Sequence, residues 1–149
     1  MATIHLPPDF KEFLKLLNAH RVEYLLIGGY AVGYFGYPRA TVDMDIWIAM
    51  NPANAEKIVT VLKEFGFNLP DLSPELFLKE WQIFRLGVPP VRIEIATAIS
   101  GVNFGECYAE RVVAELDGEQ VNLISLKNLK INKRASGRHQ DLADLENLP

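Results

Sequence analysis

Two carboxylates separated by one residue, Asp43 and Asp45, are the side chains of this sequence best suited to metal chemistry. They lie in an apolar run that continues through Ile46-Trp47-Ile48, a pattern typical of a buried strand. Residues i and i+2 of a strand point to the same side, so both carboxylates are expected on one face. Buried carboxylates need a partner, and Mg²⁺ is usually held by one or two carboxylates plus substrate phosphates. The spacing therefore predicts a magnesium site on this strand.

A glycine pair, Gly28-Gly29, follows the apolar run Leu25-Leu26-Ile27 and precedes a helix-like segment. Because glycine has no side chain, the backbone can turn sharply there and come close to a ligand. The free N–H groups at the start of a helix favour an anionic phosphate. The pair therefore predicts a phosphate cradle opposite the carboxylates, and a tight turn without a ligand is the alternative interpretation.

These features together resemble the nucleotidyltransferase superfamily of DNA polymerase β. That superfamily carries a glycine pair after a strand and an Asp-x-Asp or Asp-x-Glu motif on the next strand. Here Gly29 and Asp43 are 43 − 29 = 14 positions apart, which is compatible. Residues 24–32, 39–45 and 133–145 resemble in particular the small bacterial nucleotidyltransferases of the abortive-infection and toxin–antitoxin type. The resemblance implies an α/β (α+β) fold, in which helices pack around a mixed β-sheet and a helical segment ends the chain.

The resemblance also implies a third carboxylate on a later strand, and Glu94 in Val91-Arg92-Ile93-Glu94-Ile95 is the candidate. Many relatives have Asp at this position, so the longer glutamate is a departure from the family pattern. Carried over, Asp43, Asp45 and Glu94 are catalytic residues that hold two Mg²⁺ ions, and Glu94 orients or deprotonates the attacking hydroxyl. On the residues alone, a pairing of Glu94 with Arg92 or Arg85 on a sheet face stays open.

Nucleotide-binding residues are implied in the same way. The implied set is Gly28, Gly29, Arg39, Thr41, Lys133 and Arg138. Arg39 has two further interpretations, as a residue that steadies its loop or as an ordinary surface residue. The basic residues near Lys133, which include Lys127 and Lys130, are equally well explained as the solvated face of a terminal helix.

The activity that the resemblance implies is magnesium-dependent transfer of a nucleoside monophosphate from a nucleoside triphosphate to a hydroxyl acceptor. The sequence leaves the acceptor open among a toxin or antitoxin partner protein, a tRNA 3′ end and a small molecule such as an antibiotic. Because no separate acceptor-binding domain is evident, a partner subunit or a homodimer is a candidate second wall of the cleft. The alternative is a non-catalytic module of the same fold that binds a nucleotide or a partner, and the Glu94 departure favours it.

Composition limits the classes of protein. The 149 residues predict one domain spanning 1–149, and 49% hydrophobic residues are enough for a core. A net charge of −4 argues against a global basic surface for nucleic acid. Cys107 is the sole cysteine, which excludes an internal disulfide and a Cys-based zinc site. No secretory signal and no membrane-length apolar run is evident, so a cytoplasmic protein is expected.

Periodicity and turn signals predict the elements that position these residues. Pro7-Pro8-Asp9 starts a first helix, Asp117-Gly118 predicts a hairpin turn, Ser125 predicts a helix N-cap and Gly137 a helix stop. Strands are expected at 22–27, 42–49, 79–86, 91–96, 112–116 and 120–124, and further helices at 30–35, 52–65, 104–111, 125–136 and 138–148.

Overall fold

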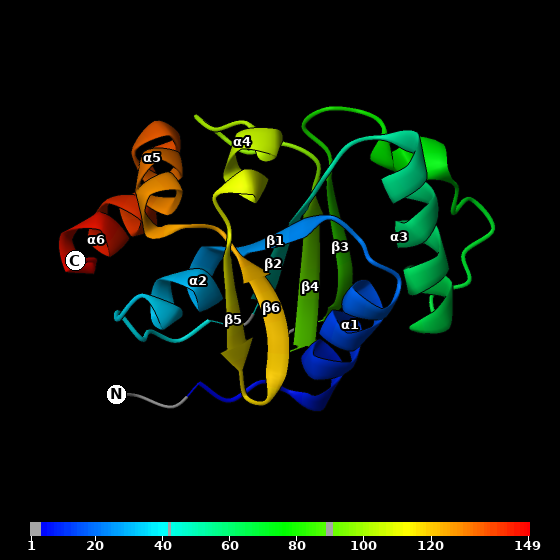
Figure 1. The fold of residues 1–149 in the computed structure, drawn as a ribbon, viewed down its shortest axis with the longest axis horizontal. Coiled ribbons are helices and arrows are strands. Elements are labelled where there is room, and N and C mark those ends of the chain that lie inside the picture. The colour runs from blue at the N-terminus through cyan, green and yellow to red at the C-terminus, as the bar shows by residue number, and fades with distance from the viewer. Residues whose placement is uncertain (1–3, 42, 89–90) are drawn as a thin grey trace.

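A six-stranded sheet forms the centre of the computed structural model, which describes residues 4–41, 43–88 and 91–149 (Figure 1). The spatial order of the strands is β3-β4-β2-β1-β6-β5. They are β1 Tyr24–Ile27, β2 Asp43–Ile48, β3 Ile83–Val88, β4 Val91–Ala96, β5 Val112–Leu116 and β6 Glu119–Leu123. The pairs β2–β4 and β1–β6 are parallel, and the other three pairs are antiparallel. The predicted α/β fold with a mixed sheet is confirmed.

Helices surround the sheet, with α5 and α6 at one end and α3 at the other (Figure 1). They are α1 Pro8–Ala19, α2 Gly28–Tyr34, α3 Pro52–Glu64, the 3₁₀ helix η1 Pro74–Phe77, α4 Phe104–Ala109, α5 Leu126–Ser136 and α6 His139–Asn147. Helix α1 packs against β6 and α3, while α5 packs against α6. In the described residues, no helix combines the length and apolar character that crossing a membrane requires.

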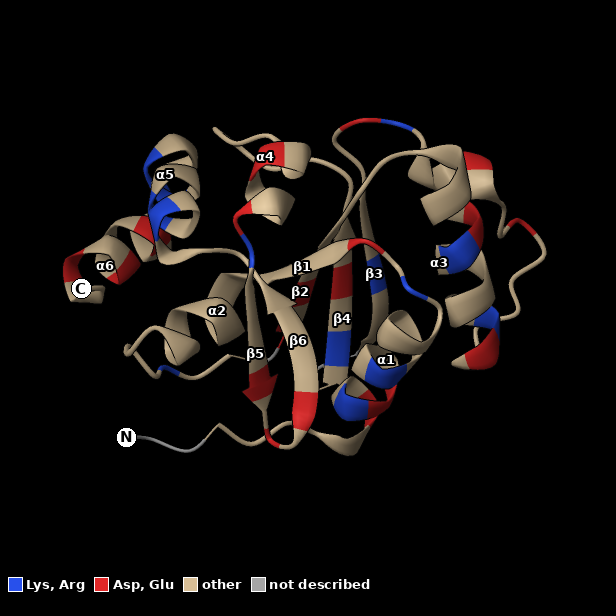
Figure 2. Cartoon of the chain, viewed as in Figure 1, with Lys and Arg blue, Asp and Glu red and all other residues tan. Residues whose placement is uncertain are grey.

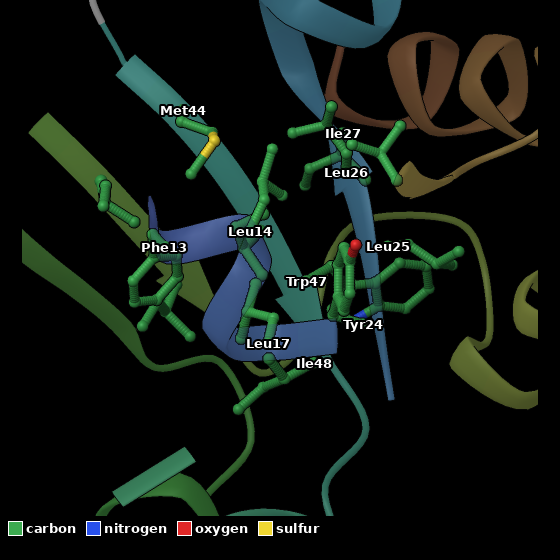
Figure 3. Packing of buried hydrophobic residues seen from close by; sticks show 14 of the residues in the cluster. Phe13, Leu14, Leu17, Tyr24, Leu25, Leu26, Ile27, Met44, Trp47 and Ile48 are labelled. Atoms are coloured by element: carbon green, nitrogen blue, oxygen red, sulfur yellow. The ribbon is translucent and has the colours of Figure 1, made fainter. Parts of the chain in front are cut away.

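The hydrophobic core lies between α1 and the central strands (Figure 3). Leu14 and Leu17 of α1 are fully buried, as are Leu26 of β1 and Met44 of β2. Alternation along β2 buries Met44 on this side and sends its neighbours to the opposite face of the sheet. The opposite face carries Asp43, Asp45 and Glu94, and at the end of β2 Trp47 packs on that face against Phe104 of α4.

Local signals set several helix ends as predicted. The side chain of Ser125 accepts a hydrogen bond from the backbone N–H of Asn128 at the start of α5. Gly137 has a left-handed backbone (φ 62°) and closes α5, since glycine adopts this conformation without strain. These two caps set the ends of α5, and Gly137 marks the break between α5 and α6, which both border the site described below.

Some boundaries differ from the sequence-based expectations. Helix α2 begins at Gly28, two residues before the predicted start, so the glycine pair forms its first turn. Strand β3 begins at Ile83 rather than at residue 79, because residues 80–81 form a turn in which Trp81 has a positive φ of 60°. Val42, where the second strand was expected to begin, lies outside the described residues, as do Pro89 and Pro90, where a turn between the third and fourth strands is expected from the proline pair.

Candidate active site

One row of the sheet carries the central carboxylates. Asp45 of β2 is the direct partner of Glu94 on the parallel neighbour β4, and Glu94 is the partner of Arg85 on β3. On the other side Asp45 is paired with Ile27, the residue before the glycine pair. Directly paired residues point to the same face of a sheet. Strand register therefore brings Asp45 and Glu94 together although 49 positions separate them in the sequence (94 − 45 = 49).

The strand that carries the two aspartates lies in the interior of the sheet. Because β2 lies between β4 and β1, Asp43 and Asp45 are not on an edge strand. Burial, followed by the charge of the adjacent Glu94 carboxylate, raises the pKa of Asp45 to about 7. Two carboxylates that share so small a space favour a proton or a cation between them. Asp45 is thus the group of this site whose environment departs most from that of an ordinary surface carboxylate.

Asp43 has a different neighbour. Its two carboxylate oxygens accept hydrogen bonds from Nε and Nη2 of Arg92, both at 2.8 Å. Arg92 is its direct partner in the parallel β2–β4 pair, so register again sets the contact. Glu94 accepts a hydrogen bond from Nε of Arg85 at 2.9 Å and lies 3.8 Å from Nη2 of Arg92. Figure 2 shows these acidic and basic bands alternating on β4 beside β3.

These contacts determine which carboxylates of the site are available to bind a cation. As the described side chains lie, no three Asp, Glu, His or Cys groups are arranged to hold a metal ion. The donor set nevertheless suits Mg²⁺, because Asp45 and Glu94 face one another and the ion usually takes one or two carboxylates. Asp43 lies on the same strand face but is bound by Arg92. Two of the three predicted metal ligands, Asp45 and Glu94, are therefore together, although Arg85 binds Glu94 as Arg92 binds Asp43.

The glycine pair packs against the same carboxylates. Gly28 has a positive φ of 70°, and a Cβ atom on it would overlap the carboxylate of Asp45. A Cβ atom on Gly29 would lie only 2.7 Å from Oγ1 of Thr41. Both glycines are therefore required by the close approach of β2 and the loop before it, a reason that is independent of any ligand. Both also line the cavity in which Asp45 and Glu94 lie.

Gly28→Ala tests this close approach. We expect the free energy of unfolding to fall by about 1–3 kcal/mol, because a non-glycine residue is strained at this φ and its methyl group displaces Asp45. Gly118→Ala is the matched control, since Gly118 has a φ of 83° and nothing within 4 Å of an added Cβ. Urea denaturation of both variants measures the difference. Equal losses would show that contact with Asp45 contributes nothing.

A buried ion network joins the C-terminal helices to the loop before β2. Lys133 of α5 is 3% exposed, and its Nζ lies 3.1 Å from Oδ1 of Asp141 and 2.9 Å from Oδ2 of Asp144. Asp144 also accepts two hydrogen bonds from Arg39, at 2.8 and 3.0 Å. Asp141 accepts a hydrogen bond from Nε of Arg138 at 2.8 Å. Figure 2 shows the basic bands of α5 and the acidic bands of α6 on these two adjacent helices.

This network sets the protonation of its carboxylates. Burial tends to raise the pKa of Asp141, but hydrogen bonds from Arg138, Ser136 and Lys133 outweigh it and hold that pKa below its ordinary value. The pKa of Asp144 is lowered in the same way, against burial, by hydrogen bonds that include those from Arg39 and Lys133. Both carboxylates are therefore ionised and balance the cations.

The predicted nucleotide-binding residues border one cavity of about 680 Å³, a volume in the range of small-ligand sites. Gly28, Gly29, Arg39, Thr41, Lys133 and Arg138 all line it, together with Asp43, Asp45 and Glu94. The structure thus brings every predicted site residue to the same cavity. Arg39 and Lys133 already have carboxylate partners, which favours the interpretation that Arg39 steadies its loop. Arg138 keeps 76% of its side chain exposed, so it is the most available of these cations.

Several residues of the site were missed by sequence reasoning. Arg92 and Arg85 were considered only as partners of Glu94, and the bidentate contact with Asp43 depends on register between distant strands. Asp141 and Asp144 belong to the C-terminal segment whose resemblance was noted, and their spacing of three on one helix was the available signal. Trp81 lines the cavity and carried no motif. Of the aromatic residues after the glycine pair, Tyr30 is buried in the core.

Comparison with known proteins finds similarity in structure. No protein-family model matches the chain, and no curated protein does. A Thermotoga maritima protein described as a nucleotidyltransferase aligns with a TM-score of 0.61 at 15% identity, over 96% of this chain and 94% of that one. The antibiotic-resistance factor ANT(2'')-Ia aligns at 0.60 and 11% identity, over 93% and 79%. The lincosamide antibiotic adenylyltransferase LnuA, solved with lincomycin bound, aligns at 0.56 and 13% identity, over 97% of each chain.

Proposed function

Because the chain has the nucleotidyltransferase fold, we propose that it is a nucleotidyltransferase that moves a nucleoside monophosphate from a nucleoside triphosphate to a hydroxyl acceptor. The observation that carries the proposal is the Asp45–Glu94 pair at the cavity, with Asp43 beside it and Gly28-Gly29 on the same wall. Phosphoryl transfer needs carboxylates that can hold metal ions and a backbone that can approach the phosphates. The carboxylate pair and the glycine pair would fill these two roles. In this proposal Asp43, Asp45 and Glu94 are the catalytic residues.

The reaction would be an in-line displacement at the α-phosphorus. The acceptor oxygen forms a bond to phosphorus, the bond to the bridging oxygen of the β-phosphate breaks, and pyrophosphate leaves. Glu94 orients the hydroxyl and takes its proton, while Gly28 and Gly29 let the leaving phosphates approach the backbone. Asp45 and Glu94 would hold Mg²⁺, together with Asp43 once it leaves Arg92. The ion would neutralise the charge on the phosphates.

The acceptor and the biological setting are part of the proposal. LnuA acts on a lincosamide antibiotic, which makes a small molecule one candidate acceptor, beside a tRNA end and a partner protein. A cytoplasmic role in a toxin–antitoxin pair and a homodimer that closes the cleft complete this hypothesis. The toxin–antitoxin setting rests on the resemblance of residues 24–32, 39–45 and 133–145.

Thermal unfolding with ATP, GTP, CTP or UTP, with and without Mg²⁺, tests the proposal. A ligand that binds only the native state stabilises it by about 2.7 kcal/mol at a hundredfold excess over its dissociation constant. We expect a magnesium-dependent rise in Tm for at least one nucleotide, and its loss in Asp43→Ala/Asp45→Ala. Mass spectrometry of candidate acceptors then locates the transferred nucleotide. A wild-type protein that no nucleotide stabilises would overturn the proposal for this chain.

A second candidate, a nucleotide- or partner-binding module without turnover, is favoured by the two arginines. Arg92 holds both oxygens of Asp43, and Arg85 holds Glu94. Both guanidinium groups neutralise carboxylates that a metal enzyme leaves free for its ions. Nucleotide-dependent stabilisation without transfer to any acceptor, in the wild type and in variants that free the carboxylates, would support this candidate.

Arg92→Gln tests whether Arg92 competes with a cation for Asp43. Loss of the guanidinium group frees Asp43, so we expect Mn²⁺, used as a spectroscopic substitute for Mg²⁺, to bind about tenfold more tightly. Arg85→Gln is the comparison variant, because it frees Glu94, the other arginine-bound carboxylate, and leaves the Asp43–Arg92 contact intact. Electron paramagnetic resonance of free Mn²⁺ gives the affinities. Weaker binding in Arg92→Gln than in the wild type would mean that Arg92 supports the metal site instead of competing with it.

A further inference from the structure

An exposed tryptophan stands at the edge of the cavity. Trp81 keeps 62% of its surface exposed, yet it lines the cavity that contains Asp45 and Glu94. Its backbone has a φ of 60°, a left-handed conformation that bulky residues rarely adopt. Residues held in such conformations gather at ligand-binding positions, where the surrounding structure enforces them. The position of Trp81 therefore calls for a functional explanation.

The turn that presents Trp81 is anchored from both sides by one buried residue. Thr97, 5% exposed, accepts a hydrogen bond at its Oγ1 from the backbone N–H of Gln82 at 3.0 Å. The same hydroxyl donates to the carbonyl of Lys79 at 2.7 Å, and the backbone N–H of Thr97 donates to the carbonyl of Gln82 at 3.1 Å. The tryptophan is thus held on a fixed turn, as a preorganised binding surface requires.

Strand register places an apolar surface between Trp81 and the carboxylates. Ile83, two residues after Trp81, is 53% exposed and is paired with Ala96 of β4. Ala96 lies two residues beyond Glu94 on the same face of the sheet, and Arg85 occupies the corresponding place beside Glu94. We call Trp81, Ile83 and Ala96 the apolar shelf. All three residues line the cavity.

The shelf and the glycine pair lie on opposite sides of the carboxylates. Gly28 packs against Asp45 and Gly29 against Thr41, toward the start of β2. The shelf lies beyond Glu94, toward the end of the parallel strand β4 and on its β3 side. In an in-line displacement the attacking and leaving oxygens are on opposite sides of the phosphorus. If the leaving phosphates lie at the glycine pair, the acceptor enters from the shelf.

We propose that the apolar shelf is the acceptor subsite and that it takes a neutral, ring-bearing molecule whose hydroxyl group reaches Glu94. This inference rests on the proposed function. An indole face binds flat rings by stacking, and the apolar face of a sugar ring packs on it in the same way. Lys79 and Glu80, which precede Trp81, have opposite charges, and Arg85 is already paired with Glu94. The charges around the shelf therefore balance, which disfavours a polyanionic acceptor such as a nucleic-acid strand.

Acrylamide quenching of tryptophan fluorescence tests the subsite. Trp47 is 2% exposed, so the quenchable emission belongs to Trp81. The probes are three neutral hydroxyl compounds, adenosine, N-acetyltyrosinamide and methyl glucoside, and a short single-stranded oligonucleotide. Each is added to the whole protein with and without Mg²⁺ and a non-hydrolysable nucleotide. We expect at least one neutral probe to reduce the quenching constant at least twofold, and the class of that probe identifies the ring.

Variants then assign the effect to the shelf. We expect the rise in Tm caused by the protecting probe to be lost in Trp81→Ala, retained in Trp81→Phe, and unchanged in the control Leu69→Ala. Leu69 is equally exposed, at 60%, but does not line the cavity. No protection by any neutral probe, or protection by the oligonucleotide alone, would overturn the assignment. So would a probe-induced rise in Tm that survives in Trp81→Ala.

The measurements with nucleotide distinguish a failure of this inference from a failure of the proposed function. If Trp81→Ala abolishes the magnesium-dependent stabilisation by nucleotide, the shelf holds the nucleobase; the acceptor assignment then fails while nucleotide binding stands. If no nucleotide stabilises the wild type, the proposed function fails, and protection of Trp81 in the absence of nucleotide still decides whether the shelf binds a ring.

Discussion

Lys133→Met is expected to lower the free energy of unfolding by about 3 kcal/mol, because it leaves two buried carboxylates without their shared cation. Asp141 is 1% exposed and Asp144 is fully buried, so water cannot replace the ammonium group. The estimate takes the lower end of the range for a broken buried ion pair, since Arg39 and Arg138 still contact these carboxylates. Urea denaturation at pH 7 measures the loss.

Lys127→Met is the matched control for Lys133→Met. It makes the same substitution on the same helix, but Lys127 is 66% exposed and its partner Glu110 lies at the surface. Surface ion pairs add little to stability, so this variant should remain close to the wild type. If the two variants lose equal stability, the network does not hold α5 and α6 together. A selective loss in Lys133→Met would show that the predicted nucleotide-binding lysine is first a structural residue.

Asp45→Asn is expected to stabilise the metal-free protein at pH 8 by about 2 kcal/mol and to abolish magnesium-dependent stabilisation by nucleotide. The folded protein holds the proton of Asp45 up to a pKa of about 7, whereas the ordinary value is 3.8. Between these values the folded state binds more protons than the unfolded state, so the stability of the wild type falls as the pH rises from 4 to 7. Asparagine carries no charge and escapes this loss.

A change in packing alone would not make the stability gain of Asp45→Asn depend on pH. The advantage of Asp45→Asn should be full above pH 7 and disappear near pH 4, where Asp45 is protonated in both states. Asp43→Asn is the control from the same strand, and it should show no gain at pH 8, because it loses the contact with Arg92. Thermal unfolding in chelator at several pH values provides the comparison. A gain that does not depend on pH would refute the proposed repulsion between Asp45 and Glu94.

The two variants address different parts of the site. Asp45 is partly buried beside Glu94, a carboxylate of like charge, which costs stability in the free protein and is the arrangement a cation would relieve. Lys133, Asp141 and Asp144 form a network of opposite charges, which supports the wall of the cavity. The carboxylate pair at the centre of the site thus lowers the stability of the fold, and the ion network beside it raises that stability.

Much of the fold follows from the sequence because its signals are local. An apolar run predicted β2, alternation around Glu94 predicted β4, and Ser125 and Gly137 predicted the ends of α5. Each of these signals spans a few residues, and its physical cause is backbone geometry or the period of side-chain burial. The fold that the structural neighbours share was predicted in another way, through the family resemblance that Gly28-Gly29, Asp43 and Asp45 carry.

The tertiary structure alone decided which partners the charged side chains have. Arg92 meets Asp43, and Glu94 meets Asp45, because β2 and β4 run parallel in one particular register. A register shift of one residue would turn every side chain to the other face, and no local signal within either strand specifies the alignment. The burial of Lys133 and the exposure of Trp81 likewise depend on elements far away in the sequence. The sequence by itself thus determined the types of residue available for chemistry, and long-range packing determined which of them are free to perform it.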